Sequence, residues 1–247
     1  MLKVLKNEII KMFNGKKFYV LSTVVIMSIV IMAVMGISDA KSEITAENFL
    51  VRTLFGMLMK PIVPMFMVLV ISETLTEDYT HGTMKFSLMT PIKKSDFIIG
   101  KLLFIALYAL IFLIISFVGS YIVGAIVFGL GSKGELLNNF IYNVKVYASV
   151  TLPLLSFSSV ISFIALLINN SGAVIGLGIG IDVIMMMIDS QMKNVMYFTF
   201  SGGMYAYEVI TKLDTHSILN FSLTACIYIC LSLLLSMFAI EKKDIVL

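Results

Sequence analysis

Residues 102–128, LLFIALYALIFLIISFVGSYIVGAIVF, form a run of 27 residues without a charged side chain. An apolar run of more than 18 residues is typical of a transmembrane helix, in which every backbone polar group is paired internally. At 1.5 Å per residue such a helix would be about 40 Å long, which exceeds a hydrocarbon core of about 30 Å. We therefore expect a membrane-spanning helix that tilts or protrudes.

The composition of the whole chain indicates the same class. Of its 247 residues, 59% are hydrophobic and 13% are charged, whereas about a quarter of the residues in a soluble domain are charged. Five further apolar runs are long enough to span a membrane. The predicted spans are 18–37, 53–72, 102–128, 146–168, 172–189 and 217–240. We expect an all-α integral membrane protein with six transmembrane helices in a single transmembrane domain, residues 1–247.

The basic residues predict the orientation. Segments 1–17, 73–101 and 241–247 hold eleven lysines, and the loops on the opposite side hold six lysine or arginine residues. Cytoplasmic loops carry the excess of basic residues, so both termini and segment 73–101 should be cytoplasmic. The single arginine among seventeen lysines resembles the output of an AT-rich bacterial genome. We therefore predict a multi-pass protein of a bacterial plasma membrane.

Two segments outside the spans have distinctive patterns. Residues 1–17 favour an amphipathic helix on the inner membrane surface, and the alternative is a basic leader that only fixes the topology. Its predicted apolar face consists of Leu2, Leu5, Ile9 and Met12. Segment 190–216 contains five aromatic residues and a Ser-Gly-Gly break, with charges at both ends. It predicts a broken, re-entrant or interfacial segment on the outer face, or else an outer loop with interfacial tyrosines.

Segment 73–101, ETLTEDYTHGTMKFSLMTPIKKSDFIIGK, is a charged, turn-rich loop between the second and third spans. Glu73 and Glu77 are four residues apart and share a face of a helix that continues the second span. Gly82 can break that helix, and Thr83 can cap a short amphipathic helix. A Thr-Pro pair then ends the short helix. The alternative is a plain solvated loop.

These residues resemble the signature of ABC-2 type transporter permeases. The pattern consists of Glu73, Glu77, Gly82-Thr83, Leu88, Thr90-Pro91, Lys93 or Lys94, Phe97 and Gly100-Lys101. Lysines stand here where the family usually has arginines. The six-span layout, the amphipathic N-terminal helix and the broken segment between spans five and six also resemble that family.

The resemblance implies that the chain is half of an exporter, in which two identical or paralogous permeases combine with two ATP-binding subunits. Residues 83–89 would form the cytoplasmic coupling helix, and the turn at 169–171 would make a second contact with the ATPase. The ATPase-coupling residues would be Glu73, Glu77, Gly82, Thr83, Phe86, Leu88, Thr90, Pro91, Lys93, Lys94, Asn169 and Asn170.

The chain lacks two common motifs for nucleotide binding and zinc catalysis. It has no G-x-x-x-x-G-K-[ST] phosphate loop and no H-E-x-x-H zinc motif. We therefore expect that the chain is not an enzyme, with no catalytic residue, metal or cofactor of its own and no nucleic-acid partner. ATP and Mg²⁺ would be bound by the partner ATPase.

Two charged residues lie well inside predicted spans, where a charge is costly and marks a candidate functional site. Lys60 is eight residues from Arg52, and Asp182 is seven residues from Asp189. This spacing places them about 12 and 10 Å below the outer ends of their spans. Because the depths match and the charges are opposite, we hypothesise that they pair or that both face a polar cavity. The alternative is that Lys60 extends outward and Asp182 hydrogen-bonds a neighbouring helix.

Three further features belong to the second and fifth spans. Pro61 and Pro64 each lack a backbone donor and should kink the second span. Met185 could form part of an adaptable wall of the translocation path, with ordinary packing as the alternative. Glycines at every fourth position predict a face for close helix contact, either within the chain or with a second permease. They are Gly172, Gly176 and Gly180.

The leading expectation is a permease subunit of an ATP-driven exporter for an amphipathic substrate. Small bacterial members of the family that it resembles often export peptides, so a toxin, a bacteriocin, an antimicrobial peptide or a drug is the expected substrate. Membrane lipid would surround the subunit. The alternatives are an ion-gradient transporter or channel, and an immunity scaffold that binds a peptide without transport.

Overall fold

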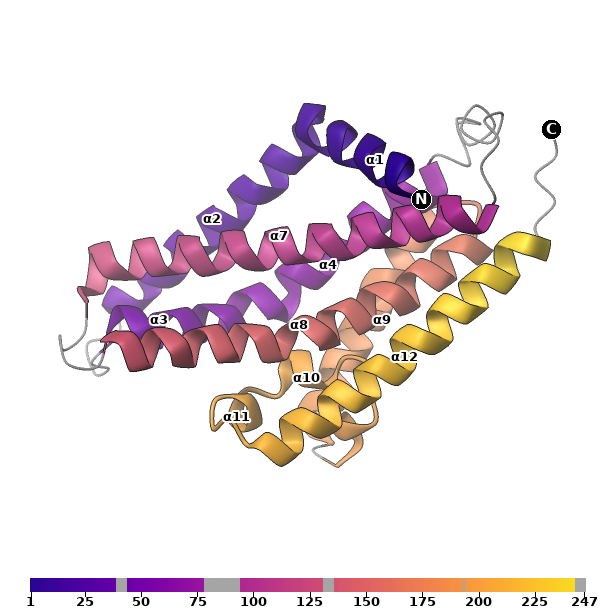
Figure 1. The fold of residues 1–247 in the computed structure, drawn as a ribbon. Coiled ribbons are helices and arrows are strands. Elements are labelled where there is room, and N and C mark those ends of the chain that lie inside the picture. Colours follow the sequence, from indigo (N-terminus) through magenta and orange to yellow (C-terminus); the bar gives the residue numbers. More distant parts are fainter. Residues whose placement is uncertain (39–43, 78–93, 131–135, 193, 243–247) are drawn as a thin grey trace.

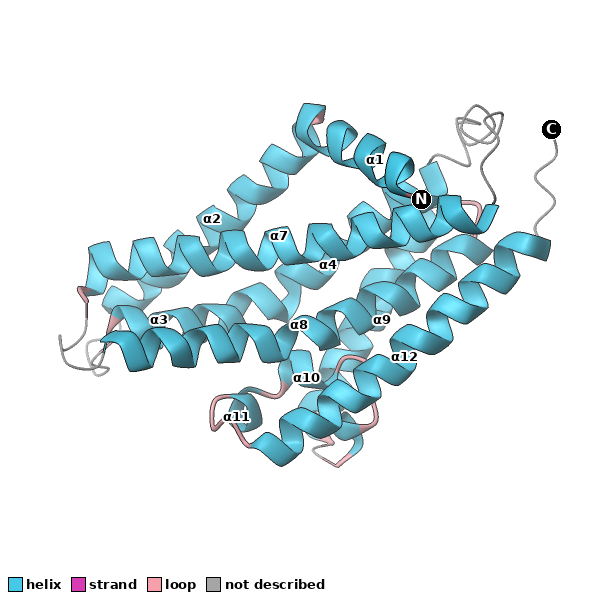
Figure 2. Ribbon diagram, in the orientation of Figure 1, coloured by secondary structure: helices cyan, strands magenta, loops and turns pink. Residues whose placement is uncertain are grey.

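The computed structural model describes residues 1–38, 44–77, 94–130, 136–192 and 194–242 (Figure 1). These residues form helices and short connections, and none of them is in a strand (Figure 2). Six helical segments are long and apolar enough to cross a membrane: Lys16–Ser38, Ala46–Thr76, Lys94–Phe128, Leu136–Leu167, Ser171–Gln191 and Thr215–Ile240. The predicted all-α class and the six apolar helices are therefore confirmed.

α1 (Leu2–Asn14) and α2 (Lys16–Ser38) are joined at Gly15. α1 folds back from α2 and lies beside the first turns of α7 (Lys94–Phe128) (Figure 1). The face of α1 that is buried against the protein consists of Val4, Glu8 and Met12, and of the predicted apolar face it includes only Met12. Leu2, which we expected on the apolar face, is exposed. The buried face is rotated because α1 packs against α7.

The second span is a series of four helical segments with a break near its middle. They are α3 (Ala46–Thr53), η1 (Leu54–Ile62), α4 (Val63–Ile71) and η2 (Ser72–Glu77), where η1 and η2 are π-helical. The break is at Lys60, whose φ of −126° and ψ of 88° are not helical, directly before Pro61. Pro64 lies in the first turn of α4, where the missing N–H has no helical partner to lose. Only the first of the two predicted kinks is therefore present.

The helices on both sides of the predicted loop 73–101 extend into it. The second span continues to Glu77, and α7 begins at Lys94. α7 has 35 residues, so it is about 52 Å long at 1.5 Å per residue. The helical continuation of the second span through Glu73 and Glu77 is as predicted, and the third helix begins before the predicted start of its span at residue 102.

α8 (Leu136–Leu167) is the central helix of the bundle. α12 (Thr215–Lys242) packs along it, and α4 packs against both α8 and α9 (Ser171–Gln191). The start of α1, the start of α7 and the end of α12 lie at one end of the bundle, here called the terminal end (Figure 1). The start of α3 and the end of α7 lie at the opposite end, here called the far end.

The segment between α9 and α12 is broken, as predicted. It contains η3 (Val195–Tyr197), α10 (Gly202–Tyr205) and α11 (Tyr207–Ile210). A Cβ on Gly202 would lie 1.8 Å from the carbonyl oxygen of Met196, and one on Gly203 would lie 2.4 Å from Cγ of Pro153 in α8. The Gly-Gly pair therefore lets this segment pack directly against α8 and against its own preceding turn.

Candidate functional site

A buried polar cluster at the terminal end surrounds Lys101, which is 1% exposed. The Lys101 ammonium lies 3.4 Å from Oε1 of Glu8 in α1. It also donates a hydrogen bond to the carbonyl oxygen of Thr74 in η2 and lies 5.1 Å from the ring centre of Phe97. Because a buried charge requires such partners, Lys101 connects α1, the end of the second span and the start of the third. We call Glu8, Thr74, Phe97 and Lys101 the Lys101 cluster.

The end of the second span is also bonded to the turn between α8 and α9. The Ser72 hydroxyl donates to the carbonyl oxygen of Ser171 over 3.1 Å. The Thr76 hydroxyl donates to the carbonyl oxygen of Ala165 over 3.5 Å. Both helices that border residues 78–93 are therefore anchored, the second span to α8 and α9 and the third span to α1.

The structure describes only some of the residues that we predicted to couple the chain to the ATPase. Glu73 is exposed and lies 3.1 Å from the ammonium of Lys17. Glu77 is the last residue of η2, and Lys94 is the first residue of α7. Those outside the described residues are Gly82, Thr83, Phe86, Leu88, Thr90, Pro91 and Lys93.

The turn between α8 and α9, which we predicted as a second contact with the ATPase, lies at the terminal end of the bundle. Asn169 and Asn170 are both exposed there. The Asn170 side chain accepts a hydrogen bond from the backbone N–H of Ala173 over 3.2 Å and so caps α9. The structure therefore gives Asn170 a capping role of its own, and its prediction as an ATPase contact stays a prediction.

Sequence reasoning gave Glu8 no role, although a signal was present. Glu8 is the only carboxylate in residues 1–38, and it stands on the lysine-rich helix that we expected to contact lipid. A lone acidic residue in such a helix indicates cationic partners, which here are Lys11 of the same helix at 3.3 Å and Lys101 of α7 at 3.4 Å. Lys101 itself was part of the quoted pattern, but nothing in the pattern predicted its burial.

Asp182 is fully buried in α9, and its partner is a tyrosine. The Tyr205 hydroxyl in α10 donates a 2.5 Å hydrogen bond to Oδ1 of Asp182. The other carboxylate oxygen, Oδ2, is buried without a hydrogen-bond partner among the described residues. Burial, with the neighbouring charge of Asp182, raises the pKa of the Tyr205 phenol, so the hydroxyl stays protonated and able to donate.

Asp189, seven residues after Asp182, anchors the same broken segment. It accepts hydrogen bonds from Oγ1 of Thr199 over 2.7 Å and from Oγ of Ser201 over 2.8 Å. Residues seven apart lie on the same face of a helix. The two carboxylates of α9 therefore hold the segment 199–205 against the bundle through hydroxyl groups.

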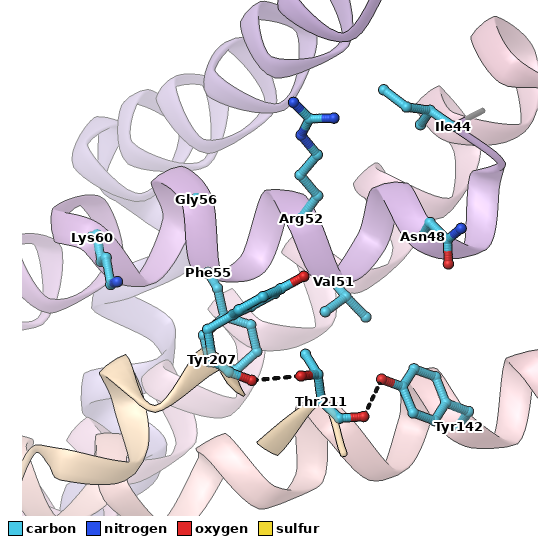
Figure 3. A pocket seen from close by; sticks show the side chains of 10 residues that line it. All are labelled: Ile44, Asn48, Val51, Arg52, Phe55, Gly56, Lys60, Tyr142, Tyr207 and Thr211. Carbon is cyan, nitrogen blue, oxygen red and sulfur yellow. Dashed lines mark hydrogen bonds between the residues drawn. The ribbon is translucent and has the colours of Figure 1, made fainter. Parts of the chain in front are cut away.

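The predicted Lys60–Asp182 ion pair does not occur in the described part of the chain, since Asp182 is bonded to Tyr205. Lys60 instead lines a cavity of about 620 Å³ near the far end. Figure 3 shows this cavity between the second span on one side and α8 and α11 on the other. Its lining residues are Ile44, Asn48, Val51, Arg52, Phe55, Gly56, Lys60, Tyr142, Tyr207 and Thr211. The predicted polar cavity is therefore present for Lys60 but does not include Asp182.

The predicted glycine stripe makes no close helix contact within the described chain. No atom lies within 4 Å of a Cβ built on Gly176 or Gly180, and the atom nearest to one on Gly172 belongs to Asn170. The glycine of α9 that does permit a close approach is Gly178, where a Cβ would lie 2.5 Å from Val68 of α4. The stripe therefore lies on an open face of α9. On the same helix, Met185 is partly buried against the core.

No group of three His, Cys, Asp or Glu side chains in the described ranges is arranged to hold a metal ion. Comparison with known proteins gave one informative match. A family model described as "Protein of unknown function (DUF2705)" matches residues 47–246, which contain the second to sixth spans. No curated protein matches the chain.

Proposed function

The chain belongs to the DUF2705 family of unknown function, and we propose that it is the permease subunit of an ATP-driven exporter. In this proposal, two permeases and two separate ATP-binding subunits form the complete transporter. Residues 83–89 dock on an ATP-binding subunit, which binds ATP and Mg²⁺. The substrate is an amphipathic peptide or drug, and the transporter works in the bacterial plasma membrane.

The observation that carries this proposal is the anchoring of both helices that border residues 78–93. The second span ends in η2, which is hydrogen-bonded to the α8–α9 turn and to Lys101. The third span starts in α7, which holds α1 through Lys101 and Glu8. A force applied to the connecting segment would therefore reach four spans and α1 directly, as ATP-driven coupling requires.

The break in the second span supports the same mechanism. The non-helical backbone at Lys60 separates the half of the span that borders residues 78–93 from the half that lines the cavity. A break of this kind can absorb a change in helix direction. We propose that coupling to the ATPase moves the terminal half of the span relative to the far half.

The open glycine face of α9 supports a second permease as a neighbour. Gly172, Gly176 and Gly180 offer a smooth surface without contact to another helix of the described chain. Small residues at this spacing allow helix backbones to approach closely in membranes. We propose that this face contacts the second permease.

Purification tests the proposal. A tagged chain isolated from its own bacterial membranes should bring down an ATPase with a phosphate loop. Leu88→Asp, on the proposed coupling helix, should abolish that association. Leu130→Asp is the matched control, because Leu130 is an exposed leucine after the end of α7 at the far end. Retention of the ATPase by the Leu88 variant would contradict the proposed docking site.

A further inference from the structure

Polar side chains lie buried between α7 and α8 in the far half of the bundle. Asn139, Asn143 and Tyr147 are four residues apart on α8, and Ser116 and Ser120 are four residues apart on α7. Side chains at this spacing share one face of a helix. Ser116, Ser120 and Asn143 are completely buried, and Tyr147 is 6% exposed. We call these five residues the polar row.

Aromatic contacts fix the level at which the two helices meet. The Phe117 ring of α7 lies 5.8 Å from the Phe140 ring and 5.0 Å from the Tyr147 ring of α8. Asn143 stands between Phe140 and Tyr147 in the sequence of α8, so it is level with the turn of α7 that contains Phe117 and Ser120. The two parts of the polar row therefore meet at this level.

Several atoms of the polar row lack a direct partner among the described residues. Both amide atoms of Asn143, Oδ1 and Nδ2, are buried without a hydrogen bond, and so are Oγ of Ser120 and the Tyr147 hydroxyl. The Tyr147 hydroxyl lies near those of Ser116 and Ser120, but not within the distance and angle of a full hydrogen bond. Buried polar groups in proteins are nearly always hydrogen-bonded. These four atoms therefore indicate a polar partner that bridges them.

Glu47 of α3 continues the polar row to the far end of the bundle. One of its carboxylate oxygens, Oε2, accepts a hydrogen bond from Nδ2 of Asn139, whereas Oε1 is buried without a partner in the described chain. The start of α3 and the start of α8 both lie at that end (Figure 1). Asn139 is eight residues before Tyr147, which corresponds to about 12 Å along α8. Unpartnered polar atoms therefore extend from the end of the bundle into its interior.

Water fits these atoms better than an ion does. A cation would bind the oxygens but would leave Nδ2 of Asn143, a donor, unpaired. An anion would lie near the Glu47 carboxylate, and neither Glu47 nor the polar row supplies a basic side chain to compensate it. Water both donates and accepts, and a buried water typically makes about three hydrogen bonds to polar groups that have no other partner.

We propose that the polar row binds ordered water molecules, which enter from the far end at Glu47 and reach as far as Tyr147. They pair with Oε1 of Glu47, with both amide atoms of Asn143, and with the hydroxyls of Ser120 and Tyr147. Tyr147 also borders a groove of about 270 Å³ whose walls are mostly apolar, so the water ends at that ring. The far part of the α7–α8 contact is thus hydrated. The proposal does not rest on export, since it concerns the chain alone.

X-ray radiolytic footprinting of the full-length chain in lipid nanodiscs tests this site, because hydroxyl radicals formed from a bound water oxidise the side chains beside it. Tyr147 should be oxidised although it is only 6% exposed. Asn143→Leu removes two partners of the water and keeps the side chain large, so it should slow the oxidation of Tyr147 about fivefold. Asn143→Ser keeps a polar group and leaves room for water, so it should retain the oxidation. Asn138→Leu is the matched control, because Asn138 is an exposed asparagine of α8 outside the polar row.

Three outcomes would overturn the proposal. The first needs no variant: oxidation of wild-type Tyr147 no faster than that of Phe112, a fully buried ring between Phe66 and Tyr108, would show a dry contact. The second is the same Tyr147 oxidation rate in the Asn143→Leu and Asn138→Leu variants. The third is equal slowing by Asn143→Leu and Asn143→Ser, which would assign the effect to packing. None of these results depends on an ATP-binding subunit, so failure here leaves the proposed export function standing.

Discussion

Replacing Tyr205 with phenylalanine removes a single hydroxyl and keeps the aromatic ring. That hydroxyl donates the 2.5 Å hydrogen bond to Oδ1 of Asp182. Because Oδ2 already lacks a partner among the described residues, the substitution leaves the whole buried carboxylate without a donor in that part of the chain. The variant therefore measures how strongly α9 holds the broken segment.

The expected loss of stability follows from two ranges of hydrogen-bond energy. A hydrogen bond to a charged group contributes about 1.5–3 kcal/mol in soluble proteins. Side-chain hydrogen bonds between transmembrane helices average about 0.6 kcal/mol, with a maximum near 1.7 kcal/mol. The Tyr205–Asp182 bond belongs at the upper end of the membrane range, because its acceptor is a carboxylate without a second donor. We expect a loss of about 1.5 kcal/mol in the free energy of unfolding, or roughly tenfold in the equilibrium constant.

Equilibrium unfolding in mixed detergent and dodecyl sulfate micelles measures this loss. Tyr228→Phe is the matched control, because its hydroxyl donates to the carbonyl oxygen of Phe198 over 3.1 Å in an exposed position. We expect that control to lose less than about 0.5 kcal/mol, as surface substitutions usually do. Equal losses in the two variants would refute the reasoning that burial of the Asp182 carboxylate sets the value of the bond.

Further predictions concern packing and pH. Lys101→Met should destabilise the protein by about 3 kcal/mol, because it removes the buried cation beside the Glu8 carboxylate and leaves the more exposed Lys11. Lys17→Met, at an exposed ion pair, should cost less than about 1 kcal/mol. Chemical unfolding compares the two. Gly203→Ala should lower the free energy of unfolding by about 1–3 kcal/mol, because the new Cβ overpacks against α8. Gly176→Ala should be neutral or slightly stabilising, since its Cβ meets no atom within 4 Å. Thermal unfolding compares the two variants. A hydrogen bond from the Ser217 hydroxyl lowers the pKa of the Asp214 carboxyl from its ordinary value of 3.8. The contribution of Asp214 to stability should therefore be full above the ordinary pKa and be lost as the pH falls through the folded-state pKa. Measured by unfolding, wild type and Asp214→Asn should differ in stability at pH 7 and converge in acid.

The membrane-spanning helices were predictable because their signal is local. Each apolar run had to form a helix to pair its backbone groups in lipid, and six such helices are present. Their ends were less predictable. α8 begins at Leu136 rather than near residue 146, because Asn139 in its first turns hydrogen-bonds Glu47 of α3. Such tertiary contacts extend a helix past its apolar stretch without leaving a periodic pattern.

The partner of Asp182 could not be predicted from depth. Residue spacing gives the height of a side chain along a helix, and Lys60 and Asp182 do have similar heights by that measure. It does not give the direction in which the side chain points within the bundle. The actual partner, Tyr205, comes from the broken segment, whose path depends on the close packing of Gly203 against Pro153.

The glycines of α9 show the same limit. The spacing predicts a face for close helix contact, and that face is open within the described chain. A second face, at Gly178, is the one that approaches Val68. The Gly178 face does not follow the four-residue glycine repeat, since Val174 and Asp182 stand four residues to either side of it, so the repeat could not indicate which face packs inside the subunit.

The central claim, that this chain couples a separate ATPase to its own spans, is tested most directly by ATP hydrolysis in reconstituted membranes. The chain and its co-purifying ATP-binding subunit would be assayed with Glu77→Gln, at the end of the second span, and with Glu208→Gln in α11 as a matched control near the far end. We predict that hydrolysis requires the chain, falls at least tenfold with Glu77→Gln and is unchanged with Glu208→Gln. Hydrolysis that proceeds equally without the chain, or equally with both variants, would contradict the claim.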